Sequence, residues 1–235
     1  MNIIITGGSK RLGAYLANQF GNNDDTVFIL TKSNSHEELD ITSNIRVVYC
    51  DLRDKKNVQQ VIQQMASDRI EIDVLINNVG TYYFGESLDM SPDVFEDLIQ
   101  TNLLGMFTMT KSCVDAFSSL KHIINIGYAG SNSNVANNYN LGYLIAKQGA
   151  NQLTKGLAPS LGRKGVRINT VSPGHIFNSV DIPTDICAEI PLGRAASYND
   201  IYNLIAFILD DQSSYITGAS IDVSGGYNCC FENSV

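Results

Sequence analysis

The sequence predicts a doubly wound α/β fold, with a seven-stranded parallel sheet and helices on both of its faces. Short apolar runs rich in Val and Ile alternate along the chain with segments of helical spacing. A glycine-rich turn joins the first apolar run to the first helical segment. The length of 235 residues suits one domain, and no repeat or linker divides the chain. We therefore expect a single domain over residues 1–235.

The predicted strands are continuous apolar runs rather than alternating ones. A strand that is buried on both faces has this pattern, which is typical of a parallel sheet between two helical layers. The seven runs cover residues 3–6, 27–31, 46–50, 74–77, 122–126, 167–171 and 220–223.

Helices are predicted where apolar residues recur three or four positions apart. Such spacing follows the first strand from Leu12 to Phe20, and it returns at residues 58–65, 103–117 and 146–157. Doubly wound sheets bind ligands at the carboxyl ends of their strands, where the strand order reverses. Because the glycine-rich and polar motifs of this chain follow predicted strands, we expect the functional site at that edge.

The glycine turn at residues 7–13 lies between a predicted strand and a predicted helix, which is the setting that a dinucleotide-binding turn requires. Glycine lets the backbone turn tightly and approach a pyrophosphate. The N-terminus of the helix then offers free N–H groups and the positive end of its dipole to the phosphates. An ordinary strand-to-helix loop, which also favours glycine, is the alternative interpretation.

Tyr143 and Lys147 are the most informative pair of residues in the chain. They are four positions apart in a predicted helix, so their side chains share one face. An ammonium beside a phenol favours the phenolate, and we expect Lys147 to lower the Tyr143 pKa from its ordinary value of about 10. Such a tyrosine can exchange protons near neutral pH. Taken alone, the pair also fits an ordinary exposed helix face.

Composition and charge exclude several classes of function. The formal net charge of −8 and the pI near 4.8 argue against a nucleic-acid-binding surface. No run of 18 apolar residues predicts a membrane span. Met1 directly precedes the first predicted strand, which leaves no room for a signal peptide and predicts a cytoplasmic protein.

The cysteines are odd in number and show no metal-ligand spacing, so we expect reduced thiols and no metal site. They are Cys50, Cys113, Cys187, Cys229 and Cys230. The adjacent pair near the C-terminus is interpreted as part of a passive tail.

Six motifs in a fixed order resemble the short-chain dehydrogenase/reductase superfamily, and the resemblance covers nearly the whole chain. The motifs are Thr6-Gly7 with Gly13, then Asp51, then Asn77-Asn78-Val79-Gly80, then Asn102, then Tyr143 with Lys147, and finally Pro173-Gly174. The resemblance implies a Rossmann fold, a nicotinamide cofactor and hydride transfer coupled to proton transfer.

The resemblance also implies which residues bind the cofactor. Asp51 matches an acid that contacts the adenine amino group, the turn at Asn78 lies over the cofactor ribose, and the turn at Pro173 lies under the nicotinamide. The implied cofactor-binding residues are Gly7, Ser9, Lys10, Arg11, Leu12, Gly13, Lys32, Ser33, Asp51, Leu52, Asn78, Val79, Gly80, Tyr143, Lys147, Pro173, Gly174 and Ile176.

NADP(H) is the expected cofactor, because Lys32 and Ser33 follow the second strand where an NAD site usually has an acid. Lys32 attracts a 2′-phosphate, and Ser33 can donate a hydrogen bond to it. Lys10 and Arg11 add positive charge to the glycine turn. The arginine, which replaces the family's usual glycine, resembles the pteridine reductase branch, where it reaches the cofactor phosphates. Lys32 as a solvated loop residue is the alternative.

The chemistry implied by the resemblance is the protonation of a carbonyl oxygen by Tyr143. Lys147 would lower the Tyr143 pKa and hydrogen-bond the nicotinamide ribose. Asn102 matches the residue that completes a water-mediated proton relay. A helix N-cap is the alternative role for this asparagine.

The family's usual serine after the fifth strand, which hydrogen-bonds the substrate carbonyl, is missing. Counting forward from that strand places Tyr128 at the position, whereas counting back from Tyr143 points to Ser131. We favour Tyr128, because its phenol can donate the same hydrogen bond, and keep Ser131 as the rival. Pteridine reductases also lack this serine.

The expected function is NADPH-dependent reduction of a small-molecule carbonyl substrate, a ketone. Imine reduction as in pteridine reductases, enone reduction or isomerisation, and a non-catalytic NADP(H)-binding sensor or partner protein are the alternatives. The resemblance further implies a homotetramer or homodimer. His175 is interpreted as a structural loop histidine, and Tyr82, Tyr83 and Phe84 either line the mouth of the pocket or simply pack.

Overall fold

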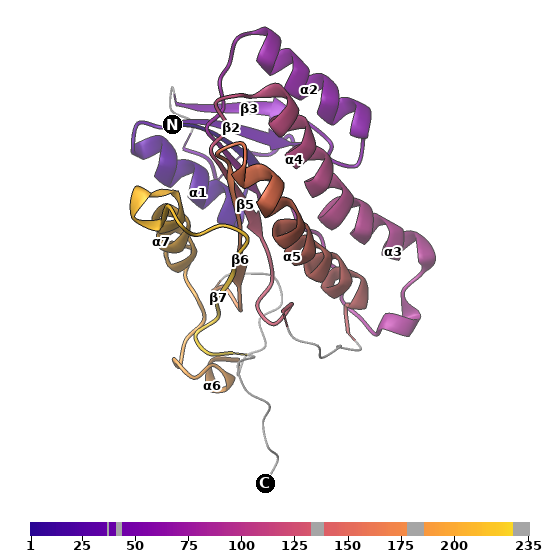
Figure 1. Cartoon of the computed structure of the whole chain (residues 1–235). Coiled ribbons are helices and arrows are strands. Elements are labelled where there is room, and N and C mark those ends of the chain that lie inside the picture. The colour runs from indigo at the N-terminus through magenta and orange to yellow at the C-terminus, as the bar shows by residue number, and fades with distance from the viewer. Residues whose placement is uncertain (37, 41–43, 133–138, 178–185, 228–235) are drawn as a thin grey trace.

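The computed structural model describes residues 1–36, 38–40, 44–132, 139–177 and 186–227. Within these ranges, seven strands form one fully parallel sheet (Figure 1). The strands are β1 (Asn2–Thr6), β2 (Thr26–Thr31), β3 (Ile45–Tyr49), β4 (Val74–Asn77), β5 (His122–Ile126), β6 (Arg167–Pro173) and β7 (Ser220–Val223). They lie side by side in the order β3-β2-β1-β4-β5-β6-β7.

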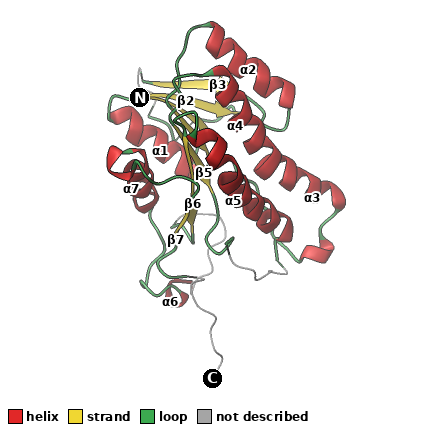
Figure 2. Cartoon of the chain, viewed as in Figure 1, coloured by secondary structure: helices red, strands yellow, loops and turns green. Residues whose placement is uncertain are grey.

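Helices cover both faces of this sheet (Figure 2). They are α1 (Arg11–Asn22), α2 (Lys55–Ser67), α3 (Pro92–Ile99), α4 (Gly105–Ala116), α5 (Leu141–Gly162), α6 (Ile186–Glu189) and α7 (Tyr198–Leu209). A π-helical segment, Gln100–Leu104, joins α3 to α4. Helices α1 and α7 pack on one face of the sheet, and α2, α4 and α5 pack on the other. Within the described ranges, no helix is long and apolar enough to cross a membrane.

The predicted doubly wound fold is confirmed. Every strand begins and ends within two residues of its predicted position. Three helices, α3, the short α6 and α7, lie outside the segments predicted as helical. Ser91 caps α3 by accepting a hydrogen bond from the Val94 N–H at 3.3 Å, and Pro92 takes the first helical position. This Ser-Pro pair is a recognised helix-start signal in the sequence.

The sheet is buried from both sides, which explains the continuous apolar runs. Ile3 and Ile5 of β1 point into the core formed with α1 and α7, whereas Ile4 between them points into the core formed with α2, α4 and α5. All three side chains are completely buried. The strand order reverses at β1, which pairs with β2 on one side and with β4 on the other. The carboxyl ends of β1 and β4 therefore form the topological switch point.

A row of buried polar side chains crosses the molecule near the carboxyl ends of β4, β5 and β6. The Asn77 amide donates to Thr110 Oγ1 at 3.1 Å and to Asn125 Oδ1 at 2.9 Å. Asn125 donates to Thr154 Oγ1 at 2.9 Å, and the Thr154 and Thr170 hydroxyls are 2.7 Å apart. Because Thr154 belongs to α5, the row fixes this helix against the sheet at the level of the functional edge.

We expect Asn125→Ala to lower the free energy of unfolding by about 2 kcal/mol, because it removes two buried hydrogen bonds and leaves a gap. Chemical denaturation measures the change. Asn22→Ala, at the exposed end of α1, is the matched control and should change the free energy of unfolding by less than about 0.5 kcal/mol. Equal effects of the two substitutions would contradict a stabilising role for the row.

Candidate active site

The glycine turn after β1 has no room for side chains at two of its positions. Gly7 has a φ of +65°, a left-handed conformation that favours glycine. A Cβ on Gly13 would lie 2.5 Å from the Gly7 carbonyl oxygen. The turn and the start of α1 are therefore in direct contact, and the free N–H groups of α1 lie where β1 ends. This cradle fits the pyrophosphate of a dinucleotide.

The turn after β4 supports the glycine turn. The Asn78 N–H donates to Thr6 Oγ1 at 3.0 Å, and Asn78 Nδ2 donates to the carbonyl oxygens of Thr6 and Gly7 at 3.2 and 3.1 Å. The Val79 side chain packs on Gly7, where a Cβ would lie 2.7 Å from Val79 Cγ2. These contacts join the carboxyl ends of β1 and β4 at the switch point.

The residues expected to bind adenosine lie at the ends of β2 and β3. The hydroxyl of Thr31, the last residue of β2, donates to Ser9 Oγ at 3.3 Å and accepts from the Ser33 N–H at 3.0 Å. Lys32 is exposed between them. Hydrogen bonds from Arg53 are the main cause that lowers the pKa of Asp51, and Lys32 adds to the effect. Lys32 and Asp51 therefore share one part of the surface.

Glu38 belongs to this region although no sequence prediction included it. The backbone N–H of Arg11, the first residue of α1, donates to a Glu38 carboxylate oxygen. Arg11 itself has a φ of 54° and follows the extended residue Lys10. An acid thus reaches the N-terminus of α1 from the loop after β2. The path of that loop brings Glu38 there across a separation of 27 residues, which no local sequence pattern reveals.

Tyr143 and Lys147 lie one turn apart on α5. Lys147 is only 2% exposed, and its Nζ donates to the Ile126 carbonyl oxygen at 2.7 Å. The same Nζ lies 5.4 Å from the centroid of the Tyr143 ring. The shared helix face is confirmed, and the alternative of an ordinary exposed pair is wrong because Lys147 is buried.

The expected direction of the Tyr143 pKa shift is wrong. Burial is the largest effect and raises the pKa of Tyr143, and the phenols of Tyr128 and Tyr82 raise it further. Burial also lowers the pKa of Lys147 to about 8, because the charged amine loses solvation. The positive charge of Lys147 therefore does not compensate for the desolvation of the Tyr143 phenol, and Tyr143 keeps its proton at neutral pH.

Asn102 is completely buried in the π-helical segment between α3 and α4. Its Oδ1 accepts from the Thr81 N–H at 3.1 Å, and its Nδ2 donates to the carbonyl oxygens of Thr81 and Leu98 at 2.8 and 2.9 Å. The alternative role as a helix N-cap is wrong, because the helical stretch already begins at Pro92. The amide instead ties the π-helical segment to the chain after β4.

Asn102 and Lys147 converge at Gly80. A Cβ on Gly80 would lie 3.3 Å from Asn102 Oδ1 and 3.6 Å from Lys147 Nζ. An amide from the π-helical segment and an amine from α5 thus approach the same point of the backbone, in the turn that supports the glycine turn. Tyr143 lies one helical turn from the amine. The structure therefore brings together Gly80, Asn102 and the pair on α5, which are far apart in the sequence.

Tyr128 follows β5 and contacts Tyr143. Their ring centroids are 5.8 Å apart, with an angle of 65° between the ring planes. Ser131 is buried, and its Oγ donates to the Tyr128 carbonyl oxygen at 2.6 Å and accepts from Asn151 Nδ2 at 2.8 Å. The structure thus brings Tyr128 to Tyr143, while Ser131 holds the backbone that carries Tyr128.

Tyr82, in the chain after β4, adds a second aromatic contact to Tyr143. These ring centroids are 6.3 Å apart, with an angle of 66° between the planes. Edge-to-face contacts of this kind are favourable and restrict ring orientation. The Tyr83 N–H donates to Asn140 Oδ1 at 3.2 Å, beside the start of α5, and the Phe84 side chain is 71% exposed.

The turn after β6 is held by β7. The Gly174 N–H donates to the Val223 carbonyl oxygen at 3.0 Å, directly after Pro173 ends β6. A Cβ on Gly174 would lie 3.0 Å from the Ser224 Cα, so this close approach requires glycine. The turn expected under the nicotinamide therefore has a fixed position at the carboxyl edge of the sheet.

His175 and Ile176 continue this turn. The His175 ring packs on the Tyr227 ring, with a centroid distance of 4.8 Å, and Ile176 forms an isolated parallel bridge. The contact agrees with the structural role expected for His175. Residues 178–185, which follow this turn, and the pair Cys229 and Cys230 lie outside the described residues.

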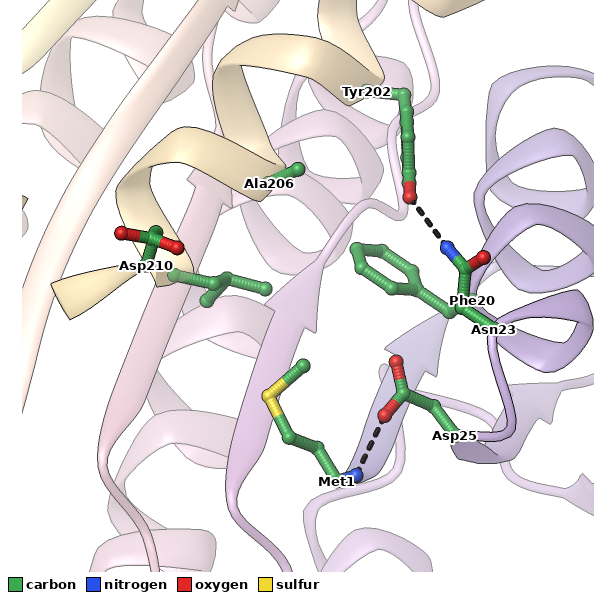
Figure 3. Close-up of a pocket in the computed structure, with 8 residues that line it drawn as sticks. Met1, Phe20, Asn23, Asp25, Tyr202, Ala206 and Asp210 are labelled. Atoms are coloured by element: carbon green, nitrogen blue, oxygen red, sulfur yellow. Dashed lines mark hydrogen bonds and ion pairs between the residues drawn. The ribbon is translucent and has the colours of Figure 1, made fainter. Parts of the chain in front are cut away.

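A separate pocket of about 240 Å³ opens at the opposite edge, where the strands begin (Figure 3). Two pairs of its polar groups interact: the Met1 amine is 2.6 Å from Asp25 Oδ1, and Asn23 Nδ2 donates to the Tyr202 hydroxyl at 2.9 Å. None of the expected site residues lines it. In the described part of the chain, no group of three His, Cys, Asp or Glu residues is arranged to hold a metal ion.

Comparisons with known proteins agree with this geometry. The model of a family described as enoyl-(acyl carrier protein) reductase matches residues 9–228. The 3-oxoacyl-[acyl-carrier-protein] reductase FabG of Escherichia coli (strain K12) is 27% identical over 234 residues, which cover 95% of each chain. FabG of Staphylococcus aureus (strain N315) is 26% identical over 236 residues, which cover 95% of this chain and 96% of the relative.

Solved structures show the same fold. A short chain dehydrogenase from Bacillus anthracis str. 'Ames Ancestor' has a TM-score of 0.90 and 26% identity, and the match covers 98% of this chain and 97% of that one. A short chain dehydrogenase from Leptospira borgpetersenii with bound NAD+ has a TM-score of 0.88 and 24% identity, over 97% and 92% of the two chains. The family model spans most of the sequence and the motifs lie at the carboxyl edge of the sheet, so the chain belongs to the short-chain dehydrogenase/reductase superfamily of oxidoreductases.

Proposed function

We propose that this protein is an NADP(H)-dependent reductase of a carbonyl substrate, with Tyr143 as its proton donor. The observation that supports this most is the convergence of Asn102 and Lys147 at Gly80, one helical turn from Tyr143. A bound nicotinamide cofactor would supply the hydride. The glycine turn, the ends of β2 and β3, and the turn after β6 would hold that cofactor along the carboxyl edge of the sheet.

Tyr143 can act as a proton donor, because its phenol is protonated at neutral pH. The pKa raised by burial makes it a weaker acid, so proton transfer depends on stabilisation of the phenolate that forms. Reduction of a carbonyl requires one proton at the oxygen as the carbon receives the hydride. The donor then becomes a phenolate, and the Lys147 ammonium, 5.4 Å from the ring centroid, stabilises that charge. The Lys147 ammonium would return a proton to Tyr143 through water, and Asn102 would help to hold that water in the space beside Gly80.

We assign to Tyr128 the hydrogen bond that a serine makes to the substrate carbonyl in the family. Its ring lies 5.8 Å from that of Tyr143, a separation that suits two phenols bound to one substrate oxygen. The hydrogen bonds of Ser131 to the Tyr128 carbonyl and to Asn151 support a structural role for Ser131. A tyrosine in place of a serine also narrows the site and favours slender or flat substrates.

The choice of NADP(H) rests on the positive residues near the adenosine end. Lys32 and Ser33 follow β2, and Lys10 and Arg11 lie at the glycine turn. These side chains favour a 2′-phosphate. The carboxylate of Glu38 beside the Arg11 N–H acts in the opposite direction, because it repels phosphate.

The first substrate class to test is the 3-oxoacyl thioesters, because the curated relatives are named 3-oxoacyl-[acyl-carrier-protein] reductases. Imine reduction is the second candidate, and Arg11 in the glycine turn, which resembles pteridine reductases, favours it. Enone reduction or isomerisation stays an alternative on the same scaffold.

A non-catalytic NADP(H)-binding role is the candidate from another class. Tyr128 in place of the family's serine is the observation that favours it. The buried Lys147 amine beside Tyr143 argues against it, since a protein that only binds the cofactor has no need of a desolvated acid and its partner.

We further propose that the protein acts in the cytoplasm as a homodimer or homotetramer. The buried thiols of Cys50 and Cys113 are unpaired, which suits a reducing compartment. Leu104, Phe107 and Ile145 expose apolar side chains on the π-helical segment, α4 and α5. Apolar residues that gather on exposed helix faces are typical of subunit contacts.

Tyr143→Phe should reduce NADPH oxidation by about 10²- to 10⁴-fold, because it removes the proton donor, while NADPH still binds. Absorbance of the reduced nicotinamide follows turnover with 3-oxoacyl thioesters, ketones, aldehydes, quinones and dihydropterins. Fluorescence titration gives the NADPH Kd. Tyr49→Phe, at an exposed tyrosine of β3, is the matched control and should keep full activity.

Two results would contradict this assignment. Turnover by Tyr143→Phe at the wild-type rate would exclude Tyr143 as the donor. Tight NADPH binding by the wild-type protein without oxidation in the presence of any substrate of the panel would favour the non-catalytic role.

Glu38→Gln should tighten NADPH binding about five- to tenfold and NADH binding less, because a carboxylate near the start of α1 repels the additional phosphate. Fluorescence titrations at low salt, where exposed charges are least screened, measure both Kd values. Asp40→Asn removes the same charge from the same loop and is the matched control. Equal effects of the two substitutions would indicate a general charge effect and contradict a specific role for Glu38.

Lys147 should contribute increasingly to the free energy of unfolding between pH 8 and pH 10, because folded Lys147 loses its proton near pH 8 and an unfolded lysine near pH 10.4. At this site the unfolded state binds more protons in this window, so the contribution rises with pH by on the order of 1–2 kcal/mol. The buried thiols of Cys50 and Cys113 act in the opposite direction, because burial raises their pKa values while unfolded thiols ionise near pH 8.5. The difference in free energy of unfolding between wild type and Lys147→Met should therefore change by this amount from pH 7 to pH 9.5, whereas the difference between wild type and the exposed-lysine control Lys55→Met should stay constant. An equal pH dependence in Lys147→Met and wild type would contradict the assignment.

A further inference from the structure

Arg53 holds the Asp51 carboxylate in the turn after β3. Its Nε lies 3.2 Å from Asp51 Oδ1, and its Nη2 lies 2.8 Å from Asp51 Oδ2. The Arg53 backbone N–H also donates to Oδ1, at 3.0 Å. A guanidinium fork on both carboxylate oxygens is a strong and directional arrangement. One residue thus fixes the orientation of the Asp51 side chain from three donors.

The same arginine fastens this turn to the long helix in which α4 continues from α3 (Figure 1). Its Nη1 donates to Asp97 Oδ1 of α3 at 3.1 Å, and its carbonyl oxygen accepts from Gln100 Nε2 of the π-helical segment at 3.1 Å. Leu52 packs on the start of α4, where a Cβ on Gly105 would lie 3.1 Å from Leu52 Cβ. The turn at residues 51–53 therefore rests on a rigid element.

The three bonds leave one acceptor position of Asp51 for a ligand. An ionised carboxylate has about four lone-pair positions, two on each oxygen. Arg53 donates twice to Oδ1 and once to Oδ2, which leaves one position on Oδ2. Arg53 also lowers the pKa of Asp51, so the group is an ionised acceptor at neutral pH. A single donor with a defined direction, such as an aromatic amino group, matches this position.

We propose that Arg53 is a positioning residue for recognition of the adenine base of the cofactor. The proposal rests on the proposed function and on the contact with the adenine amino group that the family resemblance implies for Asp51. Arg53 orients the remaining acceptor toward that amino group. A hypoxanthine base has a carbonyl oxygen in this place, so an oriented carboxylate meets an acceptor instead of a donor and rejects the base.

Because Arg53 and Asp51 are partly exposed, an effect on base recognition can be distinguished from an effect on folding. The Arg53 and Asp51 side chains are 42% and 23% exposed, and exposed ion pairs contribute little to stability. Substitution of Arg53 should therefore change base selectivity and leave the unfolding midpoint near that of the wild type. Lysine at this position keeps the charge but lacks the planar fork, so it should not preserve the orientation of Asp51.

The test compares the Kd of NADPH with that of its hypoxanthine analogue, in which oxygen replaces the adenine amino group. Wild type should bind NADPH at least about tenfold more tightly, as one hydrogen bond to a charged group predicts. In Arg53→Gln and Arg53→Lys, the ratio of the Kd of the hypoxanthine analogue to the Kd of NADPH should fall below about three. The Kd of reduced nicotinamide mononucleotide, which lacks adenosine, should not change in either variant.

Lys55→Gln, which removes a positive charge two positions away, is the matched control and should keep the wild-type ratio. An unchanged ratio in Arg53→Gln, an equal loss of affinity for all three ligands, or equal binding of the two dinucleotides by wild type would overturn the proposal. A wild-type protein that binds no nicotinamide cofactor would instead overturn the proposed function, which makes the two failures distinguishable.

Discussion

The turn after β4 is the constraint on which the geometry of the site depends. Asn78 binds the backbone oxygens at the end of β1 and in the glycine turn, while Gly80 provides the space in which Asn102 and Lys147 meet. One short segment thus contacts both the cradle for a dinucleotide and the groups assigned to proton transfer. Its own position is set by β4, which pairs with β1 and β5 in the centre of the sheet. The central strands therefore fix the position of the dinucleotide cradle relative to the groups assigned to proton transfer.

The protonation states of Tyr143 and Lys147 depend more on burial than on the contact of the two side chains with each other. Tyr143 and Lys147 share a helix face, yet the loss of solvation raises the pKa of the phenol and lowers that of the amine. Each group is thus biased toward its neutral form. A protonated phenol suits the reductive direction, in which the substrate oxygen needs a proton. Tyr128 and Tyr82 contribute to this environment, because their rings contact Tyr143 and their phenols raise its pKa further.

The residues proposed to bind adenosine differ from the buried residues around Tyr143, because they are exposed and most of them are charged. Lys32 and Arg53 contribute positive charge, whereas Asp51 and Glu38 contribute negative charge. Salt screens the interactions of these exposed charges. Selectivity for the cofactor therefore depends on the positions in which the side chains are fixed. Asp51 is oriented by a guanidinium fork, and Glu38 is placed at the N-terminus of α1. In the proposed cofactor complex, the two acids would therefore act at different parts of one ligand, the base and the phosphates.

The strands, the glycine turn and the helix that carries Tyr143 and Lys147 could be predicted from the amino-acid sequence, because these features depend on local periodicity and on short spacing. Family resemblance added Asn102 and Tyr128. The burial of Lys147 against the Ile126 carbonyl, and the Tyr143 pKa that is raised rather than lowered, became visible only in the folded chain. The contacts of Glu38 with Arg11 and of Arg53 with Asp97 join residues 27 and 44 positions apart. Desolvation and long-range contacts arise from the packing of distant segments, and so no local pattern in the chain encodes them.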